Sequence, residues 1–435
     1  MADTQAFKDA FTLSFADPDL GEKLGPVLRE YGVAVVRNVF DRKEAAQHMV
    51  ALVDSVRTIF PELSDEWTDS NMPPGPRSGL VQNLATHVPT IWSVRTSARV
   101  RRVFEEGYSY LRGRRVKHLF SSCDGFNLRP PVKPFYTPDT KDWAHLDETT
   151  CAAYERDPFA CIQGQVVLND STGCFRCSPK SVQVFKEISH LTQANFVSVS
   201  KATGKPTKPS NWNLLQQDQY EAAKALVEGV GGQWQIPIVE PPGTMILWLS
   251  STVHSARLQL KQLEEVQGKA STAGESLKGW RGAVYVCLQP QEDVPDAYFE
   301  RVQKCLHENR TTNHWGEKIF GLHYRFKEHS ARVTAYLANP VKVFQDFPDL
   351  APKMTPELKA LTTRAVEAGP VKQPKQNKHA GPTKRKVSQT ATRSASFFGM
   401  SGMSTTKKPN VLVQHEAAAE HEDAKHAAHA AHAAQ

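Results

Sequence analysis

Two stretches in the first third of the chain have apolar residues at helical spacing. Residues 41–60 begin with Asp41, a residue type that caps helix N-termini, and their apolar positions are Ala46, Met49, Val50, Val53 and Val56. Residues 89–112 repeat the pattern with Val94, Val100, Val103, Phe104, Tyr108 and Leu111. We expect a helix in each stretch, and a short apolar strand before the first at GVAVVRNVF, residues 32–40.

The pattern changes between residues 117 and 290, where turn sequences such as NDSTG and EPPG separate short strand-like runs. The runs are KHLFSSCDGFNLRP, WAHLDETT, CIQGQVVLND, QWQIPIVEP, GTMILWLSSTVHSA and GAVYVCLQP. Residues 292–337 return to helical spacing. Short central strands flanked by helices predict a mainly β core, folded as a double-sheet jelly roll. Two separate α+β domains are less favoured because no linker interrupts residues 20–340.

Near residue 370 the composition shifts to Lys, Ser, Thr, Pro and Gly, and the chain ends in an Ala/His-rich segment. Such segments have too little apolar surface to offset the entropy of ordering, so we expect a disordered tail. The predicted organisation is a strand and helical support region at 1–115, the β core at 116–295, a helical extension at 296–365 and the tail at 366–435.

Charge and cysteine content add further expectations. The net charge of +7 is concentrated in residues 371–410, which hold nine Lys/Arg and no Asp/Glu, so the remainder is close to neutral. The seven scattered cysteines are typical of reduced thiols in an intracellular protein. No secretory leader or membrane-spanning apolar run is present, so we expect no membrane contact. The expected location is cytoplasmic or, through the basic run PTKRKV at 382–387, nuclear.

His145 and Asp147 form a His-x-Asp pair within WAHLDETT. The spacing alone is weak evidence, because chance predicts about two such His-x-acid pairs and a second occurs at His421/Asp423. On a strand, however, residues two apart project from the same face and could bind one ion. His254, near the end of GTMILWLSSTVHSA, is the best candidate for a third ligand. Two imidazoles and one carboxylate that leave positions open suit Fe(II) and oxygen chemistry.

The order of these motifs resembles a known family. HLDETT, CIQGQVVLND, CFRCSPKS, PPGTMILWLSSTVHSA and RGAVYVCLQP follow one another as in the phytanoyl-CoA dioxygenase-like branch of the Fe(II)/2-oxoglutarate oxygenases. GVAVVRNVF also resembles the family's opening strand, so the resemblance spans residues 30–295. It implies a cupin-like double-stranded β-helix at 116–295, Fe(II) held by His145, Asp147 and His254, and 2-oxoglutarate and O2 as co-substrates.

The resemblance also implies a basic residue after the distal histidine that binds the far carboxylate of 2-oxoglutarate. Arg281 is favoured because it begins the run containing GAVYVCLQP, and a guanidinium can bind a carboxylate with two hydrogen bonds. Arg257 is the alternative, but it lies only three positions after His254. The residues expected to line the pocket are Gln163, Gln165, Asn127 and Arg129.

Two departures from the family pattern concern the substrate pocket. The segment between His254 and Arg281 is long, which implies an inserted loop, and Val182 stands in SPKSV where the family usually has histidine. Neither departure removes an expected metal ligand. The implied reaction is hydroxylation of an unidentified small-molecule substrate, with release of succinate and CO2.

Other features keep alternatives open. An Arg-rich stretch could receive an anionic substrate or nucleic acid, although such a run is usually a solvated helix face; it comprises Arg95, Arg99, Arg101, Arg102, Arg112, Arg114, Arg115 and Lys117. With the basic tail, this stretch keeps open an oxygenase that acts on a nuclear protein or nucleic acid. A jelly-roll enzyme that uses a metal without 2-oxoglutarate, and a non-catalytic binding module, are further alternatives. Cys174 and Cys177 lack the second ligand pair that zinc needs, so we expect two ordinary thiols in a turn.

Overall fold

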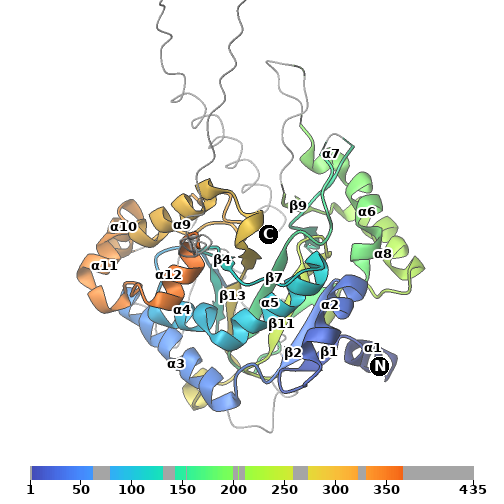
Figure 1. The fold of residues 1–435 in the computed structure, drawn as a ribbon. Coiled ribbons are helices and arrows are strands. Elements are labelled where there is room, and N and C mark those ends of the chain that lie inside the picture. The colour runs from blue at the N-terminus through green and yellow to red at the C-terminus, as the bar shows by residue number, and fades with distance from the viewer. Residues whose placement is uncertain are drawn as a thin grey trace, which may run out of the picture. The chain divides into compact units, whose positions relative to one another are not determined.

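Two β-sheets form the centre of the protein, with helices on several sides (Figure 1). The computed structural model describes residues 2–61, 79–130, 143–152, 154–198, 204, 211–257, 273–321 and 330–365. The chain divides into two units, Met1–Ala365 and Val366–Gln435, and both sheets belong to the first. The predicted tail, the basic run at 382–387 and the pair His421/Asp423 all lie outside the described residues.

The larger sheet is mixed, because one of its strand pairs is parallel and the others are antiparallel. Its strands lie in the order β1 (Thr12–Ser14), β2 (Val33–Arg37), β11 (Met245–Leu249), β7 (Ile162–Val167), β13 (Arg281–Val286), β5 (Phe126–Arg129) and β3 (Leu80–Val81). The parallel pair is β1 with β2. The sequence therefore folds as a mixture of helix and sheet with this sheet at its centre.

The smaller sheet is antiparallel and receives strands from the same stretch of chain. Its order is β10 (Ile236–Ile238), β8 (Cys174–Cys177), β12 (His254–Arg257), β6 (His145–Leu146) and β9 (Asn213–Leu214). From β5 to β8, and again from β10 to β13, successive strands alternate between the two sheets. A separate two-stranded sheet pairs β4 (Leu119–Ser121) with β14 (Leu288–Pro290).

Helices cover the outer face of the larger sheet, because each has an apolar side that packs on it. These helices are α2 (Leu20–Tyr31), α3 (Arg42–Ile59), α4 (Pro89–Thr96) and α5 (Ala98–Arg112), and they share the largest hydrophobic core with β7, β11 and β13. The start of α3 follows the predicted cap, since Asp41 and Glu44 exchange hydrogen bonds in a capping box. Residues 89–112 are helical as predicted, but in two helices: Ser97 has ψ 129°, which interrupts the helical backbone between α4 and α5.

The inner face of the larger sheet is apolar at one side and polar at the other. Val35, Ile246 and Trp248 pack against Phe175 and Ile238 of the smaller sheet. Strand register places the buried polar residues Asn127, Gln163, Gln165, Arg129 and Arg281 on the same inner face. One half of the space between the sheets is therefore lined by apolar side chains, and the other half by side chains that can form hydrogen bonds.

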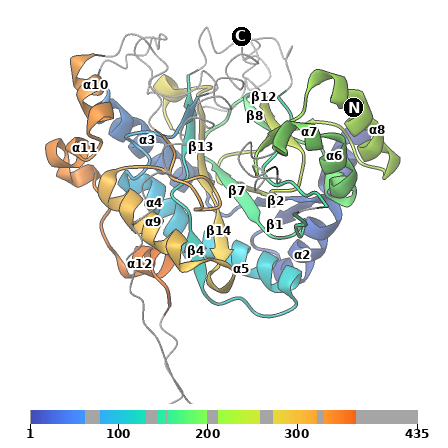
Figure 2. The same ribbon diagram turned by 90° about the horizontal axis from the view of Figure 1, so that it is seen from above.

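The remaining helices lie beside the smaller sheet, beside the two-stranded sheet, next to α3 and, at the N-terminus, next to β1 (Figure 2). α6 (Phe185–Leu191) and α8 (Tyr220–Gly229) share a hydrophobic core with Leu146 and Val253, and α7 (Gln193–Phe196) follows α6. The C-terminal helices are α9 (Asp296–Glu308), α10 (Ala331–Ala338), α11 (Lys342–Asp346) and α12 (Pro356–Thr362), and α1 (Ala2–Asp9) precedes the first strand. None of the helices in the described part of the chain combines the length and hydropathy that crossing a bilayer requires.

Candidate metal centre

Two histidines face each other from neighbouring strands of the smaller sheet. β6 and β12 pair antiparallel with His145 directly opposite His254, and the two ring centroids are 4.2 Å apart. Asp147 lies beyond the end of β6, where its backbone N–H donates a hydrogen bond to the carbonyl oxygen of Ser250 (3.0 Å). The expectation that residues 145 and 147 share one strand is wrong, since β6 ends at Leu146. A bend and the Ser250 contact turn Asp147 toward the histidines.

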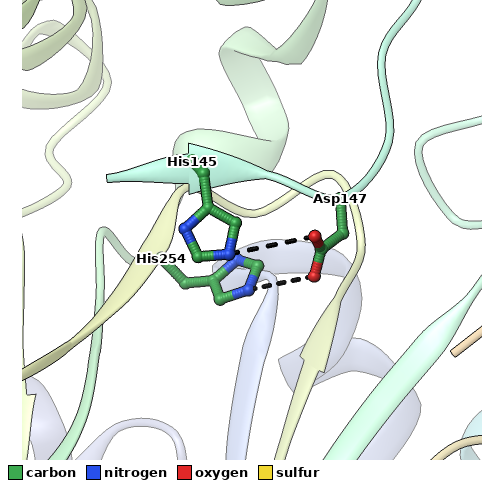
Figure 3. A group of neighbouring side chains, drawn as sticks. All are labelled: His145, Asp147 and His254. Carbon is green, nitrogen blue, oxygen red and sulfur yellow. Dashed lines mark ion pairs between the residues drawn. The ribbon is translucent and has the colours of Figure 1, made fainter. Parts of the chain in front are cut away.

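The three side chains converge on one another in the interior (Figure 3). The Nε2 atom of His254 is 3.2 Å from Oδ2 of Asp147, and Nε2 of His145 is 3.8 Å from Oδ1. One ligand atom from each of the three residues lies within 4.8 Å of the others. Each residue is buried, with at most 6% of its surface exposed. The arrangement could hold one metal ion.

Backbone carbonyl groups fix the orientation of both imidazole rings. Nδ1 of His145 lies 3.0 Å from the carbonyl oxygen of Trp143, and Nδ1 of His254 lies 2.9 Å from that of Thr252. A ring that donates its Nδ1 proton to such a carbonyl presents an unprotonated Nε2, which is the atom that faces Asp147. The Trp143 ring also stacks on His145, with centroids 4.7 Å apart. These carbonyl contacts therefore orient both histidines in the way that metal-binding histidines are oriented.

The protonation states of the group also suit a metal. Burial, followed by the nearby His254, lowers the pKa of His145 to about 3, so this ring is neutral near pH 7. Burial alone would raise the pKa of Asp147, but His314, His254 and His145 outweigh that effect and hold the pKa below its usual range. Neutral imidazole and ionised carboxylate are the forms that bind metals.

The predicted pocket residues lie at different distances from this group. Gln163 contacts it, because its Nε2 donates a hydrogen bond to Oδ2 of Asp147 (3.0 Å). Gln165 and Arg281 instead line a cavity of about 20 Å³, to which none of the three metal candidates contributes. Asn127 hydrogen-bonds Tyr285 on the same inner face. Gln163 thus contacts His145, Asp147 and His254, which we call the metal group, through Asp147, and the other predicted residues form an adjoining polar wall.

Two buried arginines lie side by side in that wall. Arg281 is directly opposite Arg129 in the pairing of β13 with β5. Burial, and then the neighbouring Arg281, lower the pKa of Arg129 to about 9. Nη1 of Arg281 is buried and has no hydrogen-bond partner among the described residues. Arg257, the alternative cation, donates both Nε and Nη2 to the carbonyl oxygen of Thr172 (3.2 and 2.9 Å). Arg281 is therefore the better placed to receive an anion.

Four of the eight basic residues in the Arg-rich stretch form ion pairs with acids of the chain. Arg95 is buried and donates hydrogen bonds to backbone carbonyls of Tyr285, Asp124 and Gly125. The ion pairs of the stretch are Arg99–Glu44, Arg102–Glu106, Arg112–Asp293 and Arg114–Glu292. The four arginines of these pairs bind to acids of the chain itself.

Cys174 and Cys177 were expected in a turn, and this expectation is wrong. They lie on β8, which is paired on both sides, with β10 and with β12. Both thiols are free and buried. Burial raises the pKa of each thiol, so both are protonated near pH 7.

Sequence reasoning missed two residues that contact Asp147 from the loop after α9. Nε2 of His314 lies 3.7 Å from Oδ2 of Asp147, and Nε1 of Trp315 donates a hydrogen bond to the Asp147 carbonyl oxygen (3.1 Å). The sequence around them, TTNHWGEK, belongs to none of the motifs and has no strand-like alternation. Only an unexplained His-Trp pair in a polar loop could have drawn attention to them.

Comparisons with known proteins leave the family open. No protein-family model matches the chain, and no curated protein does. A hypothetical protein of Escherichia coli, solved at high pH, matches with a TM-score of 0.44 and 13% identity over 78% of this chain and 88% of its own. The epimerase SnoN, solved with Fe3+, alpha-ketoglutarate and nogalamycin RO, matches with a TM-score of 0.35 and 15% identity over 63% and 85%.

A third match is EctD from S. alaskensis, solved with bound Fe. Its TM-score is 0.35 and its identity 11%, over 65% of this chain and 79% of its own. With TM-scores below 0.5, these likenesses assign neither a family nor an activity. The case for a function rests on the chain's own residues.

Proposed function

We propose that the protein is an Fe(II)- and 2-oxoglutarate-dependent dioxygenase of the phytanoyl-CoA dioxygenase-like kind. The observation that carries the proposal is the convergence of His145, Asp147 and His254, with ligand atoms within 4.8 Å of one another. Two imidazoles and one carboxylate, with further positions left open, form the donor set that non-haem Fe(II) oxygenases use. The carbonyl-bound Nδ1 atoms and the ionised Asp147 fit that ion.

The strand topology supports the proposal. The eight strands β5–β8 and β10–β13 alternate between the sheets in the manner of a jelly roll, which supports a double-stranded β-helix. Its metal candidates come from β6, from the bend after β6, and from β12. The proposed site therefore lies at strand ends that the pairing of β6 with β12, within the smaller sheet, brings together.

Each part of the site would have a separate task. His145, Asp147 and His254 would hold the ion, and Arg281 would bind the far carboxylate of 2-oxoglutarate through charge-assisted hydrogen bonds. When bound, iron and 2-oxoglutarate would supply the oxidising chemistry, with O2 as oxidant and succinate and CO2 as products. The apolar half of the interior, around Ile246 and Trp248, would exclude water. The deep burial of the ligands favours a small-molecule substrate.

The decisive test is metal binding and 2-oxoglutarate turnover by the full chain. We expect the wild type to bind one Fe(II) and to release succinate from 2-oxoglutarate across a substrate screen, and Asp147→Ala to lose both. The carboxylate supplies the only anionic ligand of the group, so its loss removes the charge that balances the ion. His190→Ala, at an exposed position of α6, is the matched control and should behave as the wild type.

A second arm separates the co-substrate site from the metal site. Arg281→Ala should leave Fe(II) binding intact and weaken 2-oxoglutarate binding about 10- to 100-fold, as expected for loss of hydrogen bonds to a charged group. Binding is followed anaerobically through the visible charge-transfer band of the Fe(II)–2-oxoglutarate chelate. Undiminished succinate release by Asp147→Ala would reject the metal site, and an unchanged 2-oxoglutarate affinity in Arg281→Ala would reject the clamp.

A further inference from the structure

The loop after α9 contacts Asp147, one of the three candidate metal ligands. Its residue Trp315 donates Nε1–H to the backbone oxygen of Asp147 (3.1 Å), and the ring is buried beside Cys161 and Cys287. The preceding His314 directs Nε2 toward Oδ2 of the same aspartate at 3.7 Å. One loop therefore contacts both the main chain and the side chain of a single proposed ligand.

This loop is anchored to the core, so its position next to Asp147 is set by the fold. Nε2 of Gln289, on β14, donates to the carbonyl oxygens of His314 (3.4 Å) and Trp315 (3.2 Å). Thr312 and Cys123 exchange two hydrogen bonds, of 2.9 and 3.0 Å. Oδ1 of Asn313 accepts hydrogen bonds from the N–H groups of Glu317 and Lys318. The imidazole of His314 thus projects from a fixed base.

The hydrogen-bonding capacity of His314 is directed at Asp147. Its Nε2 is buried and makes no hydrogen bond within the described part of the chain, and Oδ2 of Asp147 is the carboxylate oxygen that it faces. On the same oxygen, Gln163 already donates at 3.0 Å. The separation of 3.7 Å exceeds a normal N–H···O hydrogen bond by about 0.5 Å, a gap that a small rotation of the His314 side chain would close.

We propose that His314 is a positioning residue of the metal centre, which donates its Nε2–H to Asp147 and, with Gln163, fixes the orientation of that carboxylate. This inference rests on the proposed metal site at His145, Asp147 and His254. A direct ligand role is disfavoured because only those three residues, among the described ones, offer ligand atoms within 4.8 Å of one another. His314 contacts the group from outside, through the aspartate.

Loss of this contact should weaken metal binding without disturbing the fold. Partners that orient a ligand typically contribute about 10- to 100-fold to metal affinity. We therefore expect His314→Leu to bind Co(II), used as the probe ion, about 10- to 100-fold more weakly than the wild type. His314→Gln keeps an N–H donor on a side chain of similar reach and should recover most of the affinity. The side chain is 19% exposed, so both substitutions are compatible with folding.

The experiment measures the Co(II) dissociation constant of the full-length protein by competition with a chelator. His307→Leu, which removes an exposed histidine from the last turn of α9, is the matched control and should bind Co(II) as the wild type does. Thermal unfolding of the metal-free proteins should be the same for the wild type and the variants. Pulsed EPR of the vanadyl-loaded protein should count two imidazole nitrogens in the wild type and in His314→Gln.

The outcomes separate this inference from the proposed function. A wild type that binds no Co(II) or Fe(II) would remove the metal site itself. Tight binding by the wild type and equally tight binding by His314→Leu would overturn only the role of His314. A third imidazole nitrogen in the wild type that is absent from His314→Gln would also overturn it, because His314 would then be a ligand.

Discussion

Glu148 follows Asp147 directly and is a buried acid with little compensation. It is fully buried, neither carboxyl oxygen has a hydrogen-bond partner among the described residues, and Nη1 of Arg156 lies 4.0 Å away. Burial raises the pKa of Glu148 to about 8. Near pH 7 the Glu148 carboxyl is therefore protonated in the folded protein. In the unfolded chain, where its pKa has the ordinary value of 4.5, the same carboxyl is ionised.

Glu148→Gln should therefore stabilise the protein at neutral pH. Because this pKa is raised, the free energy of unfolding of the wild type is highest below about pH 4.5. It then falls as the pH rises from there through about 8. An amide mimics the protonated acid, so the variant should exceed the wild type by a few kcal/mol in free energy of unfolding at pH 8, and match it near pH 4. Urea denaturation across this pH range measures the difference. The exposed Glu155→Gln serves as control, and parallel pH profiles of the wild type and Glu148→Gln would contradict the expectation.

At the residue scale, some residues of the candidate site can be predicted from the sequence, and there is a physical reason why the others cannot. His145, Asp147 and His254 can be found because metal chemistry restricts the residue types and because the family resemblance supplies their order. Gln163 can be found because it alternates with Ile162 and Gly164 on a strand. His314 has no such local pattern, since its closeness to Asp147 arises from how a loop packs against β14. The roles of these residues in binding remain predictions.

At the scale of elements, the turn between α2 and β2 supports the strand that carries His254. Gly32 ends α2 with φ 70°, and its carbonyl oxygen accepts hydrogen bonds from Thr252 Oγ1 (2.8 Å) and from the Leu249 N–H (2.9 Å). The carbonyl of Thr252 in turn faces Nδ1 of His254. A Cβ atom on residue 32 would come within 2.3 Å of Thr252 Oγ1. Thr252 therefore links the end of α2 to His254, because its hydroxyl contacts Gly32 and its carbonyl contacts the imidazole.

We expect Gly32→Ala to weaken metal binding as well as stability. The left-handed backbone alone costs about 1 kcal/mol with alanine, and the clash would also displace Thr252. Gly113→Ala is a closely matched control, because Gly113 ends α5 with φ 62° and a Cβ there would meet nothing within 4 Å. Chemical denaturation and Co(II) titration of both variants test this. The idea fails if both variants lose the same stability and retain the same Co(II) affinity.

Among the helices and strands, those with a strong local sequence pattern are the ones that the sequence predicts most clearly. The helix at α3 could be predicted from its periodicity and from Asp41, and the strands β7 and β11 from their apolar runs. The interruption at Ser97 could not, because no proline or glycine marks it. The end of β6 at Leu146 depends on partners elsewhere in the chain, β12 and Ser250, and a local pattern cannot report them.

At the scale of the whole molecule, a bound ion should stabilise the fold. An ion that binds the folded chain and not the unfolded one adds about 2.7 kcal/mol to the free energy of unfolding when its concentration is about one hundred times its dissociation constant. We expect Fe(II), added anaerobically, to raise the thermal midpoint by several degrees, and a chelator to reverse the change. His254→Ala should show no such shift. An equal shift in His254→Ala would place the ion elsewhere.

The pairing of β6 with β12 has a mechanical consequence. β6 is two residues long, and in the described part of the chain its register with β12 is the single pair His145–His254, whereas β12 pairs with β8 along four residues. A slip of one position between β6 and β12 would turn the His145 imidazole to the opposite side of the sheet. An ion held jointly by residues 145 and 254 would cross-link the two strands and prevent that slip. Under load, the occupied protein should therefore resist separation of β6 from β12 more strongly than the empty one.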